Sequence, residues 1–124
     1  METASKKLSE EQDQVFCPAS VALNLISRKW SLHILMPLLK SDKPIRFGEL
    51  QRSIAGISQR ELTKHLREFE DHGIVSRTVF PQVPPRVEYE LTETGKSLME
   101  PITALHQWAE KYGAVLHKTR SNLS

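Results

Sequence analysis

The chain has 124 residues, of which 39% are hydrophobic, and its formal net charge is +2. This length suits one domain with a modest core, and the small net charge means that any affinity for nucleic acid must come from local clusters of cations. The sequence has neither a bilayer-spanning apolar run nor a signal-peptide core, and its single cysteine excludes a disulfide framework, so the cytoplasm is the expected location.

The amino-terminal third is predicted to contain a polar arm and two helices. Residues 1–14 are polar and charged, and we expect them to form a flexible arm. Pro18 suits the first position of a helix. The side of this helix that is expected to be buried contains Val21, Ala22, Leu25 and Ile26. A second apolar helix is predicted to begin near Lys29-Trp30, and because proline removes a backbone hydrogen bond, Pro37 predicts a kink or a later start.

Residues 47–73 have the pattern of a helix-turn-helix. The first helix is predicted over residues 48–54, followed by a turn. Ser58 and Glu61 form a capping-box pattern, which favours a second helix that begins at Ser58. This helix is predicted to end before Gly73, because glycine readily adopts the left-handed conformation that follows many helices.

The second of these helices has two different faces. Its apolar face, which should pack against the core, contains Leu62, Leu66 and Phe69. Its opposite face is cationic, which suits the phosphates of a DNA groove, and its polar side chains can read base edges. The candidate DNA-binding residues on this helix are Ser58, Gln59, Arg60, Thr63, Lys64 and Arg67. The alternative is a cationic face that is merely solvated, as most charge clusters are.

After Gly73 the apolar pattern changes to a period of two, which predicts a β-hairpin over residues 75–91. Its two strands are joined by a segment with three prolines, which should project as an exposed tip. Such a hairpin beside a helix-turn-helix is a wing. Arg86 is predicted at the wing tip, in reach of an adjacent minor groove, and the alternative is a tip arginine that makes no contact.

A carboxy-terminal helix is predicted over residues 92–117. Thr92 is expected to cap it, and Pro101 is expected to bend or restart it. Apolar residues recur in this segment at spacings of four and three, as in helices that pack along another helix. A small domain cannot cover both sides of such a helix, so this stripe is predicted to pair with a second copy of the chain. The predicted dimerisation residues are Leu98, Ile102, Leu105, Trp108, Ala109, Tyr112 and Leu116.

Several short motifs together resemble one family of bacterial transcription regulators. They are Cys17-Pro18, Lys29-Trp30, Arg46-Phe47-Gly48-Glu49-Leu50, Gly56-Ile57-Ser58-Gln59, Leu62, Leu66-Arg67-Glu68, Gly73, Pro84-Pro85-Arg86-Val87-Glu88-Tyr89 and Leu91-Thr92-Glu93-Thr94-Gly95. The chain resembles the HxlR-type regulators, which are relatives of the MarR-like winged-helix proteins, over roughly residues 15–113.

This resemblance implies an α+β fold, a winged helix-turn-helix with extra amino- and carboxy-terminal helices that form a dimer interface. The domain is expected to span residues 15–118. The resemblance also implies a homodimer that reads a near-palindromic operator in double-stranded DNA through two recognition helices and two wings.

Cys17 admits two interpretations. A lone free cysteine is most often a small buried hydrophobe. Pro18, however, is predicted to begin a helix, and the positive end of that helix would stabilise a thiolate at Cys17. Several regulators that resemble this chain sense oxidants or electrophiles through a cysteine just before the first helix. Cys17 is therefore a candidate redox or electrophile sensor, with a structural role as the alternative.

The favoured function is a sequence-specific DNA-binding transcription regulator rather than an enzyme. The five histidines include no close metal-binding pair, and catalytic signatures and phosphate loops are missing, so no metal, cofactor or catalytic residue is predicted. A membrane partner is not expected either. The competing function is a winged-helix module for protein–protein contact. The effector is not encoded in these motifs.

Overall fold

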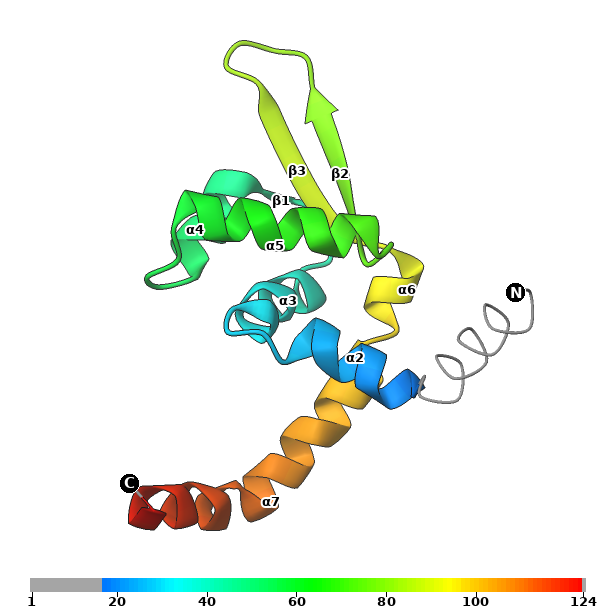
Figure 1. Cartoon of the computed structure of the whole chain (residues 1–124). Coiled ribbons are helices and arrows are strands. Elements are labelled where there is room, and N and C mark those ends of the chain that lie inside the picture. Colours follow the sequence, from blue (N-terminus) through cyan, green and yellow to red (C-terminus); the bar gives the residue numbers. More distant parts are fainter. Residues whose placement is uncertain (1–16, 124) are drawn as a thin grey trace, which may run out of the picture.

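The computed structural model describes residues 17–123, with side chains described as far as residue 115. The predicted arm at residues 1–14 lies outside the described residues. In chain order the elements are α2 (Pro18–Ile26), α3 (Ser31–Lys40), β1 (Ile45–Arg46), α4 (Phe47–Ser53), α5 (Gln59–Asp71), β2 (Val75–Phe80), β3 (Arg86–Leu91), α6 (Glu93–Lys96) and α7 (Met99–Leu123), as drawn in Figure 1.

The fold is an α+β winged helix-turn-helix, as the sequence predicted. Its three strands form an antiparallel sheet in the order β1-β3-β2, so the two-residue β1 is an edge strand beside the wing hairpin. The hairpin of β2 and β3 rises away from the helices, whereas α7 leaves the domain in the opposite direction (Figure 1). The wing and α7 are therefore separate projections from one helical body.

The helical body is organised around one hydrophobic core. Its buried apolar residues come from α3, α4, α5 and α7, from the two wing strands and from the turns beside them, and they are Ile34, Leu35, Leu38, Leu50, Ile54, Ile57, Leu62, Leu66, Phe69, Ile74, Val75, Tyr89, Leu91 and Ile102. Burial of each large apolar side chain stabilises the fold by about 1.5–3 kcal/mol. The apolar face of α5 supplies three of these side chains, and this fixes the opposite face of α5 toward solvent.

The predicted ends of the helix-turn-helix are confirmed. Ser58 caps α5 through a capping box, in which the Glu61 amide donates to the Ser58 hydroxyl over 3.0 Å and the Ser58 amide donates to the Glu61 carboxylate over 3.3 Å. Gly73 follows α5 with a φ of 71°, a left-handed conformation that side chains other than glycine rarely adopt. Sequence-local chemistry therefore sets the length of the recognition helix.

The amino-terminal helices differ from the prediction in two ways. None of the nine α2 residues, all of which the structure describes, is buried, and Val21 remains 48% exposed. The expected buried side of α2 was therefore wrong within a single chain, because only part of that side packs against the core. In addition, α3 begins at Ser31, directly after the predicted start at Lys29-Trp30, and it continues through Pro37, where a kink or a later start was expected.

The segment predicted as a helix over residues 92–117 is divided into α6 and α7, which agrees with the restart expected at Pro101. Pro101 has no amide hydrogen to donate to the carbonyl of Ser97, so a continuous helix would lose a hydrogen bond there. The chain instead restarts at Met99, which places Pro101 in the first turn of α7, where amides have no helical partner. Thr92 caps only the short α6, by accepting a hydrogen bond from the Gly95 amide.

Gly95 explains how closely α6 approaches the sheet. A Cβ atom at this position would lie 2.1 Å from the carbonyl oxygen of Ile74, which no side chain tolerates. The Thr92 hydroxyl also bonds to the carbonyl groups just before β2. This contact ties the end of β3 to the start of β2, and so holds the base of the wing against the helical body.

Candidate nucleic-acid interface

The outward face of α5 carries the cations that the sequence predicted there. Arg60, Lys64 and Arg67 are exposed, and they lie opposite the buried Leu62 and Leu66. A shallow depression of about 670 Å³ runs along this face, and its lining residues are Gln59, Arg60, Thr63, Lys64, Arg67 and Glu68. Five of the six predicted residues on this helix therefore share one surface.

Ser58 and Thr63 have partners of their own. The Ser58 hydroxyl lies 3.0 Å from both the Glu61 carboxylate and the Glu61 amide, so it belongs to the capping box. The Thr63 hydroxyl donates to the carbonyl of Gln59 over 2.7 Å. The structure thus assigns Ser58 the task of setting where α5 begins, while the side chain of Gln59 stays exposed at the same end.

A hydrogen bond joins the inner side of α5 to the segment before α3. Trp30 donates its indole Nε1–H to the Glu61 carboxylate over 2.7 Å, and its ring lies 3.8 Å from where a Cβ of Gly56 would be. The Trp30 hydrogen bond, followed by those from Ser58, lowers the pKa of Glu61. The carboxylate therefore stays ionised and joins the start of α5 to the start of α3.

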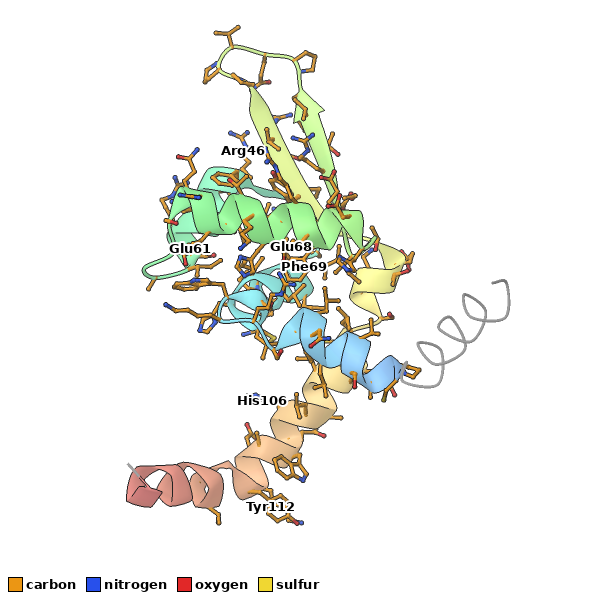
Figure 2. All side chains as sticks on the ribbon, in the orientation of Figure 1. Arg46, Glu61, Glu68, Phe69, His106 and Tyr112 are labelled. Carbon is orange, nitrogen blue, oxygen red and sulfur yellow. The ribbon has the colours of Figure 1, made fainter. Side chains whose placement is uncertain are left out.

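A second contact between α5 and this segment lies two helical turns further along α5. Arg28 pairs with Glu68, and Glu61 and Glu68 are both labelled on the side of α5 that faces α3 in Figure 2. Neither contact follows from the sequence pattern, because each joins segments that are far apart in the chain. Since the two acidic side chains are seven residues apart, the segment at residues 28–30 constrains both the position and the tilt of α5.

An open groove of about 600 Å³ lies between the start of α5, α4 and the wing. Its lining residues are Arg46, Phe47, Gly48, Glu49, Arg52, Gln59, Thr63, Gln82, Pro84, Pro85, Arg86, Val87 and Tyr89. This lining contains three arginines from three different elements, Arg46, Arg52 and Arg86, and one acidic residue, Glu49. Positive potential in such a groove attracts phosphates.

Arg46 and Arg52 are functional candidates that sequence reasoning missed. Arg46 ends β1, and Figure 2 shows it on the side of α5 from which the wing rises. Arg52 belongs to the last turn of α4, with its guanidinium 3.3 Å from where a Cβ of Gly48 would be. Neither residue belongs to a periodic cationic face, and the only available signal was that Arg46 closely precedes the predicted first helix of the helix-turn-helix and that Arg52 lies inside it.

The predicted place of Arg86 at the wing tip was wrong. Arg86 is the first residue of β3 and pairs with Phe80, the last residue of β2. The tip is formed by the residues between these strands, of which Val83 is fully exposed. The guanidinium of Arg86 packs 4.0 Å from the ring centre of Phe80, its cross-strand neighbour. Arg86 therefore lines the groove from the start of β3 and not from the tip of the wing.

The predicted dimerisation stripe is divided by the fold. Ile102 is buried in the core of its own chain, so it is not available to a partner, and Leu98 is partly buried against the same core. Further along α7, Leu105, Trp108 and Tyr112 are 45%, 51% and 44% exposed. The rings of Trp108 and Tyr112 lie 5.4 Å apart, and Ala109 is exposed beside them. The side chain of Leu116 lies outside the described residues.

Cys17 is exposed at the amino-terminal end of α2, where it is the N-cap residue. The amides of Ser20 and Ala19 and the Ser20 hydroxyl lower the pKa of the thiol, with the Ser20 amide contributing most. The sulfur does not form a cap hydrogen bond in α2, so these donors act mainly on the thiolate. The interpretation of Cys17 as a buried hydrophobe was therefore wrong.

Within residues 17–115, whose side chains the structure describes, no three histidine, cysteine, aspartate or glutamate side chains gather where they could hold a metal ion. Over the same part of the chain, no helix combines the length and the apolar character needed to cross a bilayer.

Residues 25–117 match the family model described as HxlR-like helix-turn-helix. The chain belongs to the HxlR-like helix-turn-helix family. An HTH-type transcriptional regulator from Methanothermobacter thermautotrophicus is 46% identical over 102 residues, covering 82% of this chain and 76% of its own length.

Two solved structures of similar regulators have the same architecture. The reduced form of the redox regulator HypR is 39% identical with a TM-score of 0.73, covering 82% of this chain and 99% of its own. A MarR-family regulator from Enterococcus faecalis is 39% identical with a TM-score of 0.70, covering 81% and 89% of the two chains. This HxlR-like chain is therefore a transcriptional regulator of the helix-turn-helix type, and no enzymatic family is indicated.

Proposed function

We propose that this protein binds a near-palindromic DNA operator sequence-specifically as a homodimer. The observation that carries the proposal is the continuity of two cationic surfaces, because Gln59 and Thr63 line both the depression on α5 and the arginine-lined groove beside the wing. In this arrangement α5 enters the major groove, with Gln59 and Arg60 toward base edges and Lys64 and Arg67 toward phosphates. The wing then follows the adjacent backbone and minor groove.

A second copy of the chain is the partner that the exposed apolar residues favour. Leu105, Trp108 and Tyr112 form one apolar surface on α7, and Val21 and Leu23 are further exposed apolar residues on α2. Contiguous apolar surface of this kind, with aromatic residues in it, is typical of subunit interfaces. Two-fold symmetry would place the two α5 helices about one turn of DNA apart, which matches a near-palindromic operator.

We expect the wild-type protein to bind DNA from the region upstream of its own gene with a steep dependence on salt. Each neutralised phosphate contributes a slope of about −0.9 in a plot of log affinity against log salt, so six or more contacts across a dimer cost on the order of 10³-fold between about 50 and 200 mM salt. Footprinting would locate the protected bases, and fluorescence anisotropy would give the slope.

The competing function, a module for protein–protein contact, makes the opposite prediction for the same experiment. A scrambled duplex of equal length and composition serves as the control. Binding to both duplexes that is equally weak, or a footprint without two related half-sites, would refute the proposed operator recognition.

We also propose that Cys17 makes DNA binding responsive to oxidants or electrophiles. Its exposure, its position at the start of α2 and the lowered pKa of its thiol support this role. One similar protein, HypR, is described as a redox regulator. With one cysteine per chain, the available products are a disulfide between two subunits, a mixed disulfide with a small thiol, or a thioether formed with a quinone. Disulfide formation transfers two electrons to the oxidant, whereas the quinone adds to the thiolate.

Treatment with diamide or a quinone should change the operator affinity of the wild type and leave that of Cys17→Ser unchanged. Because α2 also carries exposed apolar residues expected at the subunit interface, a modified Cys17 should alter the spacing of the two recognition helices. Mass spectrometry identifies the adduct while gel-shift assays measure affinity. Equal responses of the two proteins, or an unresponsive wild type that carries the adduct, would exclude Cys17 as the sensor.

A further inference from the structure

The carboxylate of Glu88, on β3 of the wing, lies close to two arginine side chains. The Glu88 Oε2 atom lies 3.3 Å from Arg86 Nε and 4.0 Å from Arg46 Nε. Arg86 and Glu88 are two residues apart on β3, so their side chains share one face of the strand, and Arg46 is the cross-strand neighbour of Glu88 on β1. The sheet register itself therefore brings both guanidiniums to the same oxygen.

The environment of Arg86 restricts the direction of its side chain. Its guanidinium lies against the Phe80 ring, with 4.0 Å between the guanidinium carbon and the ring centre. The Nε atom is covered from solvent and has no well-aligned hydrogen bond, although Glu88 lies within ion-pair distance of it. The contact with Glu88 is thus electrostatic rather than a formed hydrogen bond.

The rest of the Arg86 side chain remains accessible. It is 28% exposed and lines the groove between α5 and the wing, whereas its Nε is covered. The terminal Nη groups of an arginine form the fork that binds a phosphate or a base edge in two places. Arg46, at 54% exposure, lines the same groove on the other side of Glu88.

We propose that Glu88 and Phe80 are positioning residues that aim the Arg86 fork into the groove at a fixed spacing from Arg46. This inference rests on the proposed DNA binding. A carboxylate so near DNA weakens the general attraction to phosphate, but it reduces the number of directions in which the two arginines can point. Glu88 therefore lowers affinity for any DNA and raises the preference for DNA whose backbone fits the fixed pair.

The experiment compares affinity for the footprinted operator with affinity for a scrambled duplex of the same length. Glu88→Gln should bind the scrambled duplex as well as or better than the wild type, because a negative charge is lost. The ratio of operator affinity to scrambled affinity should nevertheless fall on the order of tenfold, as expected when one well-placed contact is lost. Phe80→Leu, which removes the ring, should lower the same ratio, whereas Phe80→Tyr, which keeps the ring, should preserve it.

Two outcomes would overturn the inference while leaving the proposed function intact. If Glu88→Gln raises both affinities in parallel, Glu88 is only a nearby negative charge. If Phe80→Leu and Phe80→Tyr behave alike, the ring does not position Arg86. Thermal unfolding of each variant shows whether the domain still folds, so that a change in the ratio is interpreted only for folded protein.

A measurement without DNA tests the positioning directly. The Nε–H signal of Arg86 in a nitrogen–proton NMR spectrum, assigned by its disappearance in Arg86→Lys, should show slow exchange with water and restricted motion in the wild type. Both should be lost in Phe80→Leu and in Glu88→Gln. A mobile Arg86 signal in the wild type would refute the inference even if DNA binds. A wild type that binds no DNA, yet has an ordered Arg86, would refute the proposed function and the preference for DNA attributed to Glu88.

Discussion

Replacing Leu105 and Tyr112 together with glutamate should yield a monomer that binds the operator about 10²–10⁴-fold more weakly, because the second half-site is no longer engaged in the same complex. Both side chains are nearly half exposed on α7, and Tyr112 packs against Trp108. Two carboxylates would have to lose water to be buried at a subunit interface, and this cost opposes association. Sedimentation and gel-shift assays measure the two effects.

The matched control places the same two charges on the other side of α7. Thr103 and Gln107 are exposed and lie on the face of the helix opposite Leu105 and Tyr112. Thr103→Glu with Gln107→Glu should leave the dimer and its operator affinity nearly unchanged. A wild type that is monomeric at micromolar concentration, or a Leu105 and Tyr112 variant that still dimerises, would disprove the proposed role of α7.

Removal of Arg60 should reduce operator affinity by about 1–3 kcal/mol, the range for a lost bidentate contact with a base. Removal of Lys64 should weaken binding to all sequences and flatten the salt slope by about one unit, because one phosphate contact is lost. Both side chains are exposed on α5, so Arg60→Ala and Lys64→Ala should leave the folded domain intact. Anisotropy titrations at several salt concentrations separate these two kinds of loss.

Lys43→Ala is the control for these substitutions, because Lys43 is exposed in the turn after α3 and lines neither groove. It should change neither the salt slope nor the preference for the operator. Unaltered binding by both Arg60→Ala and Lys64→Ala would show that α5 is not the reading helix. A loss of preference in Lys64→Ala would instead assign Lys64 to a base.

Much of the fold follows from signals that are local in sequence. The capping box of Ser58 and Glu61, the left-handed Gly73 and the alternation along β2 and β3 each fix a backbone conformation within a few residues. The cationic face of α5 could be predicted because helical periodicity alone puts Arg60 and Lys64 side by side. These features need no knowledge of what lies across the core.

The features that the sequence did not predict depend on contacts between distant segments. Helical spacing alone cannot distinguish Ile102, which is in the core of its own chain, from Leu105, which is exposed. The hydrogen bond from Trp30 to Glu61 joins residues 31 positions apart, and the approach of Arg46 to Glu88 depends on the strand register. The sequence therefore allowed a better prediction of the residues on the outward face of α5 than of the residues that line the groove beside the wing.

Contacts on the inner side of α5 hold this helix in place, so the operators of proteins with this scaffold can diverge through changes on its outward side. Ser58 and Glu61 set where α5 begins, and the buried Leu62, Leu66 and Phe69 hold it against the core. The outward positions 59, 60, 63, 64 and 67 contribute little to that anchoring. A combinatorial library confined to those five positions should therefore yield folded proteins with new DNA preferences, since mutations there change the recognised sequence without compromising stability.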